Sequence, residues 1–459
     1  MRTVHALFLS AGLLLPVLSP ASGRAETLTQ ALASAYSSNP EINSARAATR
    51  GVDEGVPLAK SQYRPTVGLD LTVTSRGSQT DPTSFGSLPG YHTRTTGAAG
   101  ITVQQALFRG FRTRNAVRQA EADVRASRQL QQNTVQNVLF DAAQAYMDVL
   151  RDTAILNVRH QNVAFLQEQV RAAGDRFNVG ENTRTDVAQA RAALSLANAQ
   201  VCLAEAQLAA SRASYRRFIG RDPVRLGPGT VPADLIPPSL GQAIDAGEAS
   251  HPAILAAVYQ ADSDAFVVKQ VEGELLPTVS LQASAERDLG INYTGRTDDV
   301  TVVGQVQVPL YQGGAVAARV RQAKELVGQR KIEIDLNRDQ VRAAIVSAWG
   351  QLDASVGEIS AARAQVEASQ IALGGVQEEQ AVGQRTTLDV LNSQQDLLSA
   401  QINLISAEHD RVVASYSLIS AMGRLSAEEL RLPVDLYHPE QHYQAVKDKW
   451  HGLRTPDGR

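Results

Sequence analysis

Cysteine is almost absent from this 459-residue chain, which contains only one, and the formal net charge is only −3. A single cysteine excludes a disulfide framework and a cysteine-based zinc site. The lack of a basic excess argues against a nucleic-acid partner. The sequence also lacks a convergent set of Ser, His and carboxylate residues, a phosphate-binding glycine loop and a metal-ligand cluster. It therefore predicts a protein that is not an enzyme and uses no metal or cofactor.

Two features that could suggest a reactive or metal site have simpler interpretations. Cys202 lies in an alanine-rich helical run, which predicts a small buried or interfacial side chain. His438 and His442 have a spacing that could bind a metal on a helix. Because Pro439 lies between them and no third ligand accompanies them, we interpret residues 431–459 as a polar, solvated tail.

Long apolar runs are missing beyond the N-terminus. Residues 1–25 combine an early Arg2, an apolar run over 6–18 and small residues before Glu26, a pattern typical of a secretory signal peptide. No later run approaches the roughly 18 apolar residues of a transmembrane helix. The sequence therefore predicts an exported protein that is either soluble or inserted into a membrane as strands.

The main positive feature is an internal duplication. Residues 176–187 read RFNVGENTRTDV and are answered by EQAVGQRTTLDV at 379–390. Flanking motifs keep this offset of 203 residues, and upstream it becomes 212, where Asn39-Pro40 is answered by His251-Pro252. The repeat therefore comprises a whole structural half rather than a short unit. We place the first repeat at 26–235 and the second at 236–430, with the boundary in a proline-rich linker.

Each repeated turn is expected to join two long helices. Gly180 and Gly383 supply the backbone conformation that ends a helix. The Thr and Asp residues that follow can accept hydrogen bonds from the free amides of the next helix. The sequence predicts helical hairpins over about 112–220 and 315–424, with a first helix on the order of 100 Å long.

Two segments, about 65–108 and 277–311, instead contain strands that alternate apolar and polar residues with the period of β-hairpins. In the first segment, the Gly, Ser, Pro and Thr content from 75 to about 96 predicts a loop between the strands. Each predicted strand has about 9–11 residues, long enough to cross a membrane at a tilt. One strand alone would favour a sheet on a soluble domain, but export and the flanking long helices favour membrane strands. Four strands cannot close a barrel, so two chains would supply eight strands or three chains twelve.

Together these motifs resemble the TolC family of outer-membrane channel proteins over nearly all of the mature chain. The resemblance implies an α+β membrane protein in which three chains build a twelve-stranded transmembrane β-barrel and a long α-helical coiled-coil barrel. It also implies a homotrimer in the outer membrane of a Gram-negative bacterium, in contact with outer-membrane lipid, and a periplasmic location for the tail at 431–459. Two partners are implied as well: a proton-driven or ATP-driven inner-membrane pump and its periplasmic adaptor. The motifs that carry the resemblance are 177–180 (FNVG), 382–386 (VGQRT), 389–391 (DVL), the repeated Leu-aromatic-x-Gly at 107–110 and 310–313, and 421–425 (AMGRL).

The resemblance also assigns roles at the hairpin turns. Asp389 matches a carboxylate that lines the periplasmic gate, whereas Asn392 replaces a second acidic residue one turn later. Positions that hold neighbouring hairpins closed are matched by Thr185, Asp186 and Arg385, with Gln380 where an aromatic partner is usual. The adaptor-docking turns are matched by Val179, Gly180, Val382 and Gly383.

The expected function is an exit duct of a tripartite efflux system for toxic, relatively hydrophobic small molecules. A type I protein secretion duct is the alternative within the same family, because the pump and not the duct selects the cargo. A soluble periplasmic helical scaffold or adaptor is the alternative from another class.

Overall fold

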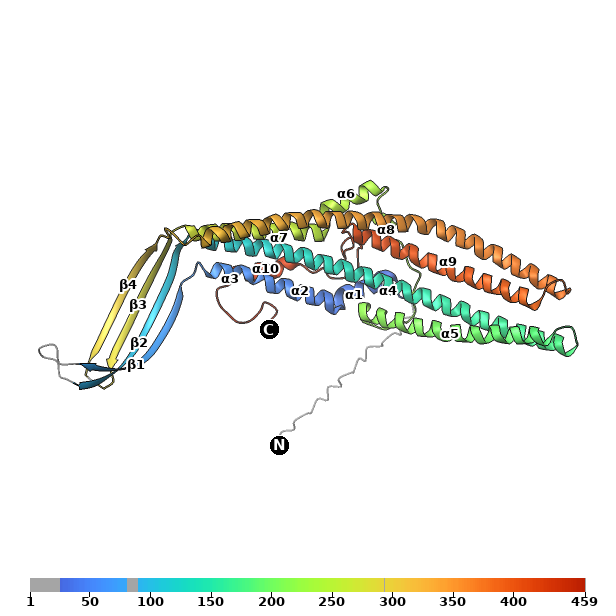
Figure 1. Ribbon diagram of the computed structural model, residues 1–459, viewed down its shortest axis with the longest axis horizontal. Coiled ribbons are helices and arrows are strands. Elements are labelled where there is room, and N and C mark those ends of the chain that lie inside the picture. Colours follow the sequence, from blue (N-terminus) through green and yellow to red (C-terminus); the bar gives the residue numbers. More distant parts are fainter. Residues whose placement is uncertain (1–24, 81–89, 293, 459) are drawn as a thin grey trace, which may run out of the picture.

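A computed structural model of the chain describes residues 25–80, 90–292 and 294–458. The molecule is elongated, with a β-sheet at one end and the turns of two helical hairpins at the other (Figure 1). The predicted signal peptide lies outside the described residues apart from Ala25. The described helices and strands are α1 (Leu28–Ser38), α2 (Pro40–Asp53), α3 (Gly55–Ser61), β1 (Thr66–Thr80), β2 (Gly90–Arg109), α4 (Arg112–Asn178), α5 (Arg184–Ile219), a short 3-10 helix (Ala233–Leu235), α6 (Leu240–Ser250), α7 (Pro252–Glu272), a second 3-10 helix (Gly273–Leu275), β3 (Thr278–Gly290), β4 (Arg296–Gln307), α8 (Ala315–Ala381), α9 (Thr387–Ala421) and α10 (Pro439–Val446).

The four strands form one antiparallel sheet in the order β1-β2-β3-β4, and its two faces differ in polarity. One row of paired residues is apolar and consists of Leu69, Ile101, Ala285 and Val300. The next row, on the opposite face, consists of Asp70, Gly100, Glu286 and Asp299. Val67, Leu69, Leu71 and Val73 are exposed along β1. An exposed apolar face opposite a polar face is the pattern of a sheet that separates lipid from an aqueous lumen.

The first β-hairpin is longer than the sequence predicts. β1 has 15 residues and β2 has 20, whereas the prediction was about 9–11 for each strand. Residues 75–80 and 90–96, predicted as loop from their Gly, Ser and Thr content, are paired in register, and the Ser75 and Thr95 hydroxyls lie 3.1 Å apart. The prediction of a loop was wrong there because backbone pairing in a hairpin does not need apolar side chains.

Two long helical hairpins make up most of the molecule. α4 and α8 each contain 67 residues, which corresponds to roughly 100 Å of helix. α5 returns along α4, and α9 returns along α8 (Figure 1). Among the described residues, no helix combines the length and apolar character needed to cross a bilayer.

The main core lies midway along the molecule, where the two halves meet. The Tyr146 hydroxyl lies 2.7 Å from the Gly227 carbonyl oxygen, which fixes the linker between the halves against α4. Burial of this ring raises the pKa of Tyr146 to about 12, so the hydroxyl stays protonated and can donate. The core includes Leu28, Leu139, Tyr215, Ala243, Ile345 and Leu418.

The C-terminal segment and Cys202 differ from their predicted environments. The interpretation of a solvated tail is wrong for His442, because α10 packs on α2 and His442 Nδ1 lies 2.8 Å from Asp53 Oδ2. Both side chains are buried, and burial raises the pKa of the Asp53 carboxyl. Cys202, predicted to be buried or interfacial, is exposed on the single chain. Composition alone could not reveal that a polar tail buries one of its histidines against a distant helix.

Candidate functional site at the tips of the helical hairpins

The two hairpin turns have nearly the same geometry. Gly180 and Gly383 have φ angles of +83° and +81°, in the left-handed region where glycine is favoured. Thr183 Oγ1 accepts from the Asp186 amide at 3.2 Å, and Thr386 Oγ1 accepts from the Asp389 amide at 3.2 Å. In each turn the Asp Oδ2 accepts in return from the backbone amide of the Thr at 2.9 Å. The repeated sequence therefore produces the same capping box at the start of α5 and of α9.

Asp389 is held rigidly by this cap. Its Oδ2 accepts from the Thr386 amide at 2.9 Å and from the Thr386 hydroxyl at 2.8 Å. These two hydrogen bonds lower the pKa of Asp389, so the carboxylate carries a fixed negative charge at the tip. Asn392 is exposed one turn later on α9. Helix capping alone accounts for the position of Asp389, because Asp186 does the same in the first copy.

The predicted latch residues do not meet within one chain. Arg385 Nε donates to Glu379 Oε2 at 2.8 Å across its own turn, and Gln380 Nε2 donates to Thr387 Oγ1 at 3.3 Å. Thr185 is exposed on the other hairpin. Within the part of the chain that the structure describes, no hydrogen bond or ion pair joins Arg385 to Thr185 or Asp186. Any such tie must form between chains.

The turns expose apolar side chains at matching positions. Val179 is 72% exposed and Val382 is 71% exposed. Both lie directly before the left-handed glycine of their turn, so the backbone directs them away from the hairpin. Figure 1 places the two turns at the same end of the molecule. The pair forms a small duplicated apolar surface at the tips, which is hereafter called the tip surface (Val179, Gly180, Val382, Gly383).

Sequence reasoning missed a polar cluster that joins the hairpins farther from the tips. His409 of α9 places Nε2 2.9 Å from Asp148 Oδ1 of α4, and Nδ1 2.8 Å from Asp410 Oδ1. Arg151 donates to Asp148 and Asp152 at 2.9 and 2.8 Å. The signal available in the sequence was weak: acidic residues one turn apart, and a histidine, at otherwise apolar helical positions.

The same cluster extends to α5. The Ser211 hydroxyl donates to Asp152, whose side chain is buried. The hydrogen bonds and charge of Asp152 and Asp148 raise the pKa of Arg151 against the opposing effect of burial. Three helices of both repeats are therefore joined by one network of hydrogen bonds, whose central residue on α9 is His409.

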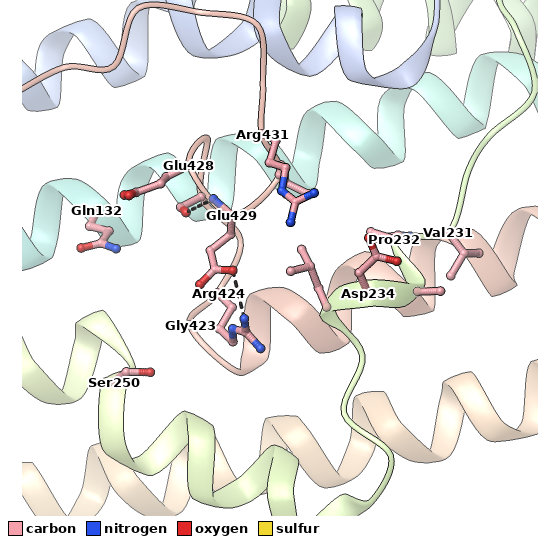
Figure 2. A pocket seen from close by; sticks show the side chains of 14 residues that line it. Gln132, Val231, Pro232, Asp234, Ser250, Gly423, Arg424, Glu428, Glu429 and Arg431 are labelled. Carbon is pink, nitrogen blue, oxygen red and sulfur yellow. Dashed lines mark hydrogen bonds and ion pairs between the residues drawn. The ribbon is translucent and has the colours of Figure 1, made fainter.

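A cavity of about 880 Å³ lies between the linker that follows α5, the end of α9 and the tail (Figure 2). Arg424 donates to Glu429 at 2.9 Å within it. Figure 2 shows Arg431 entering from the tail side and Asp234 from the linker side. Because its lining mixes cations and carboxylates, the cavity favours no particular charge on a ligand. The tips therefore remain the candidate site.

The fold and the tips define a class of protein: an elongated outer-membrane channel subunit with a membrane sheet and long helical hairpins. The sequence model of outer membrane efflux proteins matches residues 31–221 and 243–424. The chain belongs to this family, which confirms the resemblance to TolC and sets aside the soluble scaffold. The two matched ranges follow the internal duplication.

Similar proteins agree with this assignment. The outer membrane efflux protein BepC of Brucella suis is 47% identical over 96% of this chain and 95% of its own length. TolC of Escherichia coli is 25% identical over 89% and 84%. The alkaline protease secretion protein AprF of Pseudomonas aeruginosa is 25% identical over 64% and 63%. The solved structure of the Campylobacter jejuni CmeC outer membrane channel shares the fold, with a TM-score of 0.76, 15% identity and coverage of 92% and 89%.

Proposed function

We propose that three copies of this chain form the exit duct of a tripartite efflux system that exports toxic, relatively hydrophobic small molecules. The observation that carries the proposal is the 47% identity, over nearly the whole of both chains, to a protein named as an outer membrane efflux protein. The duct is passive. Its energy and its choice of cargo come from an inner-membrane pump, which reaches it through a periplasmic adaptor.

Trimer formation is supported by the edges of the sheet. Among the described residues, β1 and β4 each have one edge without a strand partner, and an open edge is not tolerated in lipid. β1 of one copy therefore pairs with β4 of the next until the barrel closes. The polar row that contains Asp70 and Glu286 then faces the lumen, and the apolar row that contains Leu69 faces lipid.

The tips supply the gate and the docking surface in this proposal. Three hairpin pairs around one axis bring the Asp389 carboxylates close together, and like charges repel. Thr185 and Asp186 of a neighbouring copy compete with Glu379 for Arg385 in the closed duct, with Gln380 beside them. The adaptor binds the exposed tip surface, and its binding energy shifts the population toward the open state.

Ethidium accumulation tests the efflux role directly. Cells that lack the chain should accumulate more dye than cells to which it is restored, because the pump then has no exit. A double variant, Val179→Asp with Val382→Asp, should fail to restore efflux although it still forms trimers in the outer membrane. A matched control, Val224→Asp, changes an exposed valine in the linker far from the tips. Normal dye levels without the chain would overturn the small-molecule role.

Protein secretion is the second candidate, and the similarity to AprF favours it. The same duct would then serve an ATP-driven pump with a protein cargo. Loss of one or more proteins from the culture medium of cells that lack the chain, with unchanged dye accumulation, would establish this role instead.

A further inference from the structure

Two adjoining cavities lie where the sheet meets the helices. The larger one, of about 510 Å³, is bounded by α3, α4 and the C-terminal segment. The smaller one, of about 150 Å³, lies beside the end of β2. Both are lined by Tyr63 and Arg114. The two cavities together are called the junction site below.

The larger cavity has an excess of positive charge. Lys60, Arg64, Arg114 and Arg118 line it, against only Glu121 and Asp448. Lys60 pairs with Asp448 at 2.6 Å, and Arg64 donates to the Lys449 carbonyl oxygen at 2.9 Å. Among the described residues, neither Arg114 nor Arg118 forms an ion pair. The Arg118 guanidinium lies 5.9 Å from the centre of the Phe266 ring, a contact with the ring face that leaves its N–H groups able to donate. Both guanidinium groups can thus bind an anion.

The junction site lies at the level where the strands leave the membrane. Arg64 precedes the start of β1 by two residues, and Gln105 Nε2 of β2 donates to the Tyr63 carbonyl oxygen at 2.9 Å. Trp450, whose ring lies 4.5 Å from the Arg64 guanidinium, is 68% exposed. Leu453 is fully exposed beyond it. Trp and Tyr with adjacent cations are typical of a membrane–water interface.

The smaller cavity is on the apolar side of the sheet. Phe108 pairs with Val279, which lies on the same face of β3 as Ala285 of the apolar row. The Phe108 ring packs edge-on against Phe111 at 5.1 Å, and both residues line the cavity with Arg114. An anion held by Arg114 would therefore have an apolar surface directly beside it, on the face that meets lipid.

We propose that the junction site binds an anionic phospholipid of the periplasmic leaflet. The guanidinium groups of Arg114 and Arg118 bind the headgroup phosphate, for which planar paired donors are well suited. An acyl chain lies along Phe108 and Phe111, and Trp450 anchors the C-terminal segment at the interface. Charge complementarity and continuity with the lipid-facing side of the sheet favour lipid over free phosphate as the occupant.

Lipid retention by the purified full-length trimer tests the proposal. After exchange into nanodiscs of mixed phosphatidylglycerol and phosphatidylethanolamine, the wild type should retain phosphatidylglycerol selectively, as measured by native mass spectrometry. The pair Arg114→Gln with Arg118→Gln should lower that retention several-fold. Arg171→Gln with Arg338→Gln, two exposed arginines far from the junction site, should not. Equal retention in both double variants, or displacement of the lipid by millimolar inorganic phosphate, would overturn the proposal.

Trp450 offers a second measurement that does not depend on the arginine variants. The chain has two tryptophans, so Trp349→Phe leaves Trp450 as the only indole. Brominated phosphatidylglycerol should quench its fluorescence more than brominated phosphatidylethanolamine at the same density. Equal quenching by both lipids would mean that the segment touches the membrane without selecting a headgroup, which contradicts the proposal. Neither assay involves transport, so each outcome is independent of the cargo.

Discussion

Asn39 and His251 occupy equivalent positions in the two repeats and cap their helices with different chemistry. Asn39 Oδ1 accepts from the Glu41 amide at 2.8 Å, and His251 Nδ1 accepts from the Ala253 amide at 3.1 Å. A proline follows each cap at the first helical position. Only a neutral imidazole can accept this bond, and burial lowers the pKa of His251 from its ordinary 6.5.

This difference predicts a pH dependence confined to the second repeat. Because the folded-state pKa is lowered, the contribution of His251 to stability is complete above pH 6.5 and is lost as the pH falls through the lowered value. His251→Asn should remove this part of the acid sensitivity, measured as trimer melting temperature against pH. Asn39→His should add a similar sensitivity to the first repeat. An unchanged pH profile in both variants would contradict the assignment.

Gly220 and Gly423 are a second pair of equivalent residues that differ in their surroundings. Both have positive φ, +89° and +78°, so alanine costs about 1–2 kcal/mol at either position. A Cβ on Gly423 would lie 2.8 Å from the His251 Cα, whereas on Gly220 it would lie 3.1 Å from the rotatable Ser38 Oγ.

Gly423→Ala should therefore destabilise the protein more than Gly220→Ala. The added loss is on the order of 1–3 kcal/mol, because backbone atoms rather than a side chain must move. Chemical denaturation of the two variants side by side measures the difference. Equal losses would show that the helix end at Gly423 shifts freely.

The sequence was sufficient to predict the local structure of the tips but not their electrostatic partners. Gly383, Thr386 and Asp389 interact within one turn, so their spacing alone implies the capping box that is present. Glu379 approaches Arg385 only after the turn has closed. His409 and Asp148 are brought together by the packing of α9 on α4, and no local pattern reports such a contact.

At the scale of elements, the contact between α4 and α9 depends on a histidine that faces carboxylates at both ring nitrogens. His409 is 7% exposed and Asp148 is 21% exposed, whereas Asp410 is largely in solvent. Replacing His409 with leucine leaves Asp148 without this partner at a half-buried position. Because Arg151 still pairs with Asp148, the loss should be that of one hydrogen bond to a charged group, about 1.5–3 kcal/mol.

A double-mutant cycle distinguishes this contact from simple packing. His409→Leu should be strongly destabilising in the wild type and much less so when Asp148 is already Asn, as measured by the free energy of unfolding. Arg363→Leu with Glu408→Gln, an exposed ion pair between α8 and α9, provides the control cycle and should show little coupling. Additive losses in the His409 cycle would mean that its ring contributes only packing.

Elements with strong periodicity were predictable, and elements defined by tertiary contacts were not. The absence of Gly and Pro over most of α4 and the alternation in β1 and β3 indicate a long helix and strands directly, whereas the membrane position of the strands was inferred from their context. Residues 75–80 carry no such pattern. They pair with β2 because they continue a strand that began earlier in the sequence. α10 is polar and short, and contacts with distant helices determine its place: His442 with Asp53, Glu440 with Arg128, and the buried side chain of Val446.

At the scale of the whole molecule, the closed state should depend on which of two carboxylates pairs with Arg385. Within its own chain Arg385 pairs with Glu379, and both side chains are about half exposed. In the proposed trimer, Asp186 of the neighbouring copy offers an alternative carboxylate whose pKa is lowered by its Thr183 hydrogen bonds, so that it stays charged. A tie between copies restricts the opening of the tips, whereas a pair within one turn does not.

Single-channel conductance in planar bilayers separates these two partners. Arg385→Ala should raise the open fraction, because the side chain that ties neighbouring copies together is then missing. Glu379→Gln should leave it unchanged or lower it, since Arg385 is then free to bind the neighbouring carboxylate. Arg363→Ala removes an exposed arginine from the same hairpin away from the tips and should have no effect. If Arg385→Ala and Glu379→Gln raise the open fraction equally, the intrachain pair stabilises the closed turn and the tie between copies is absent.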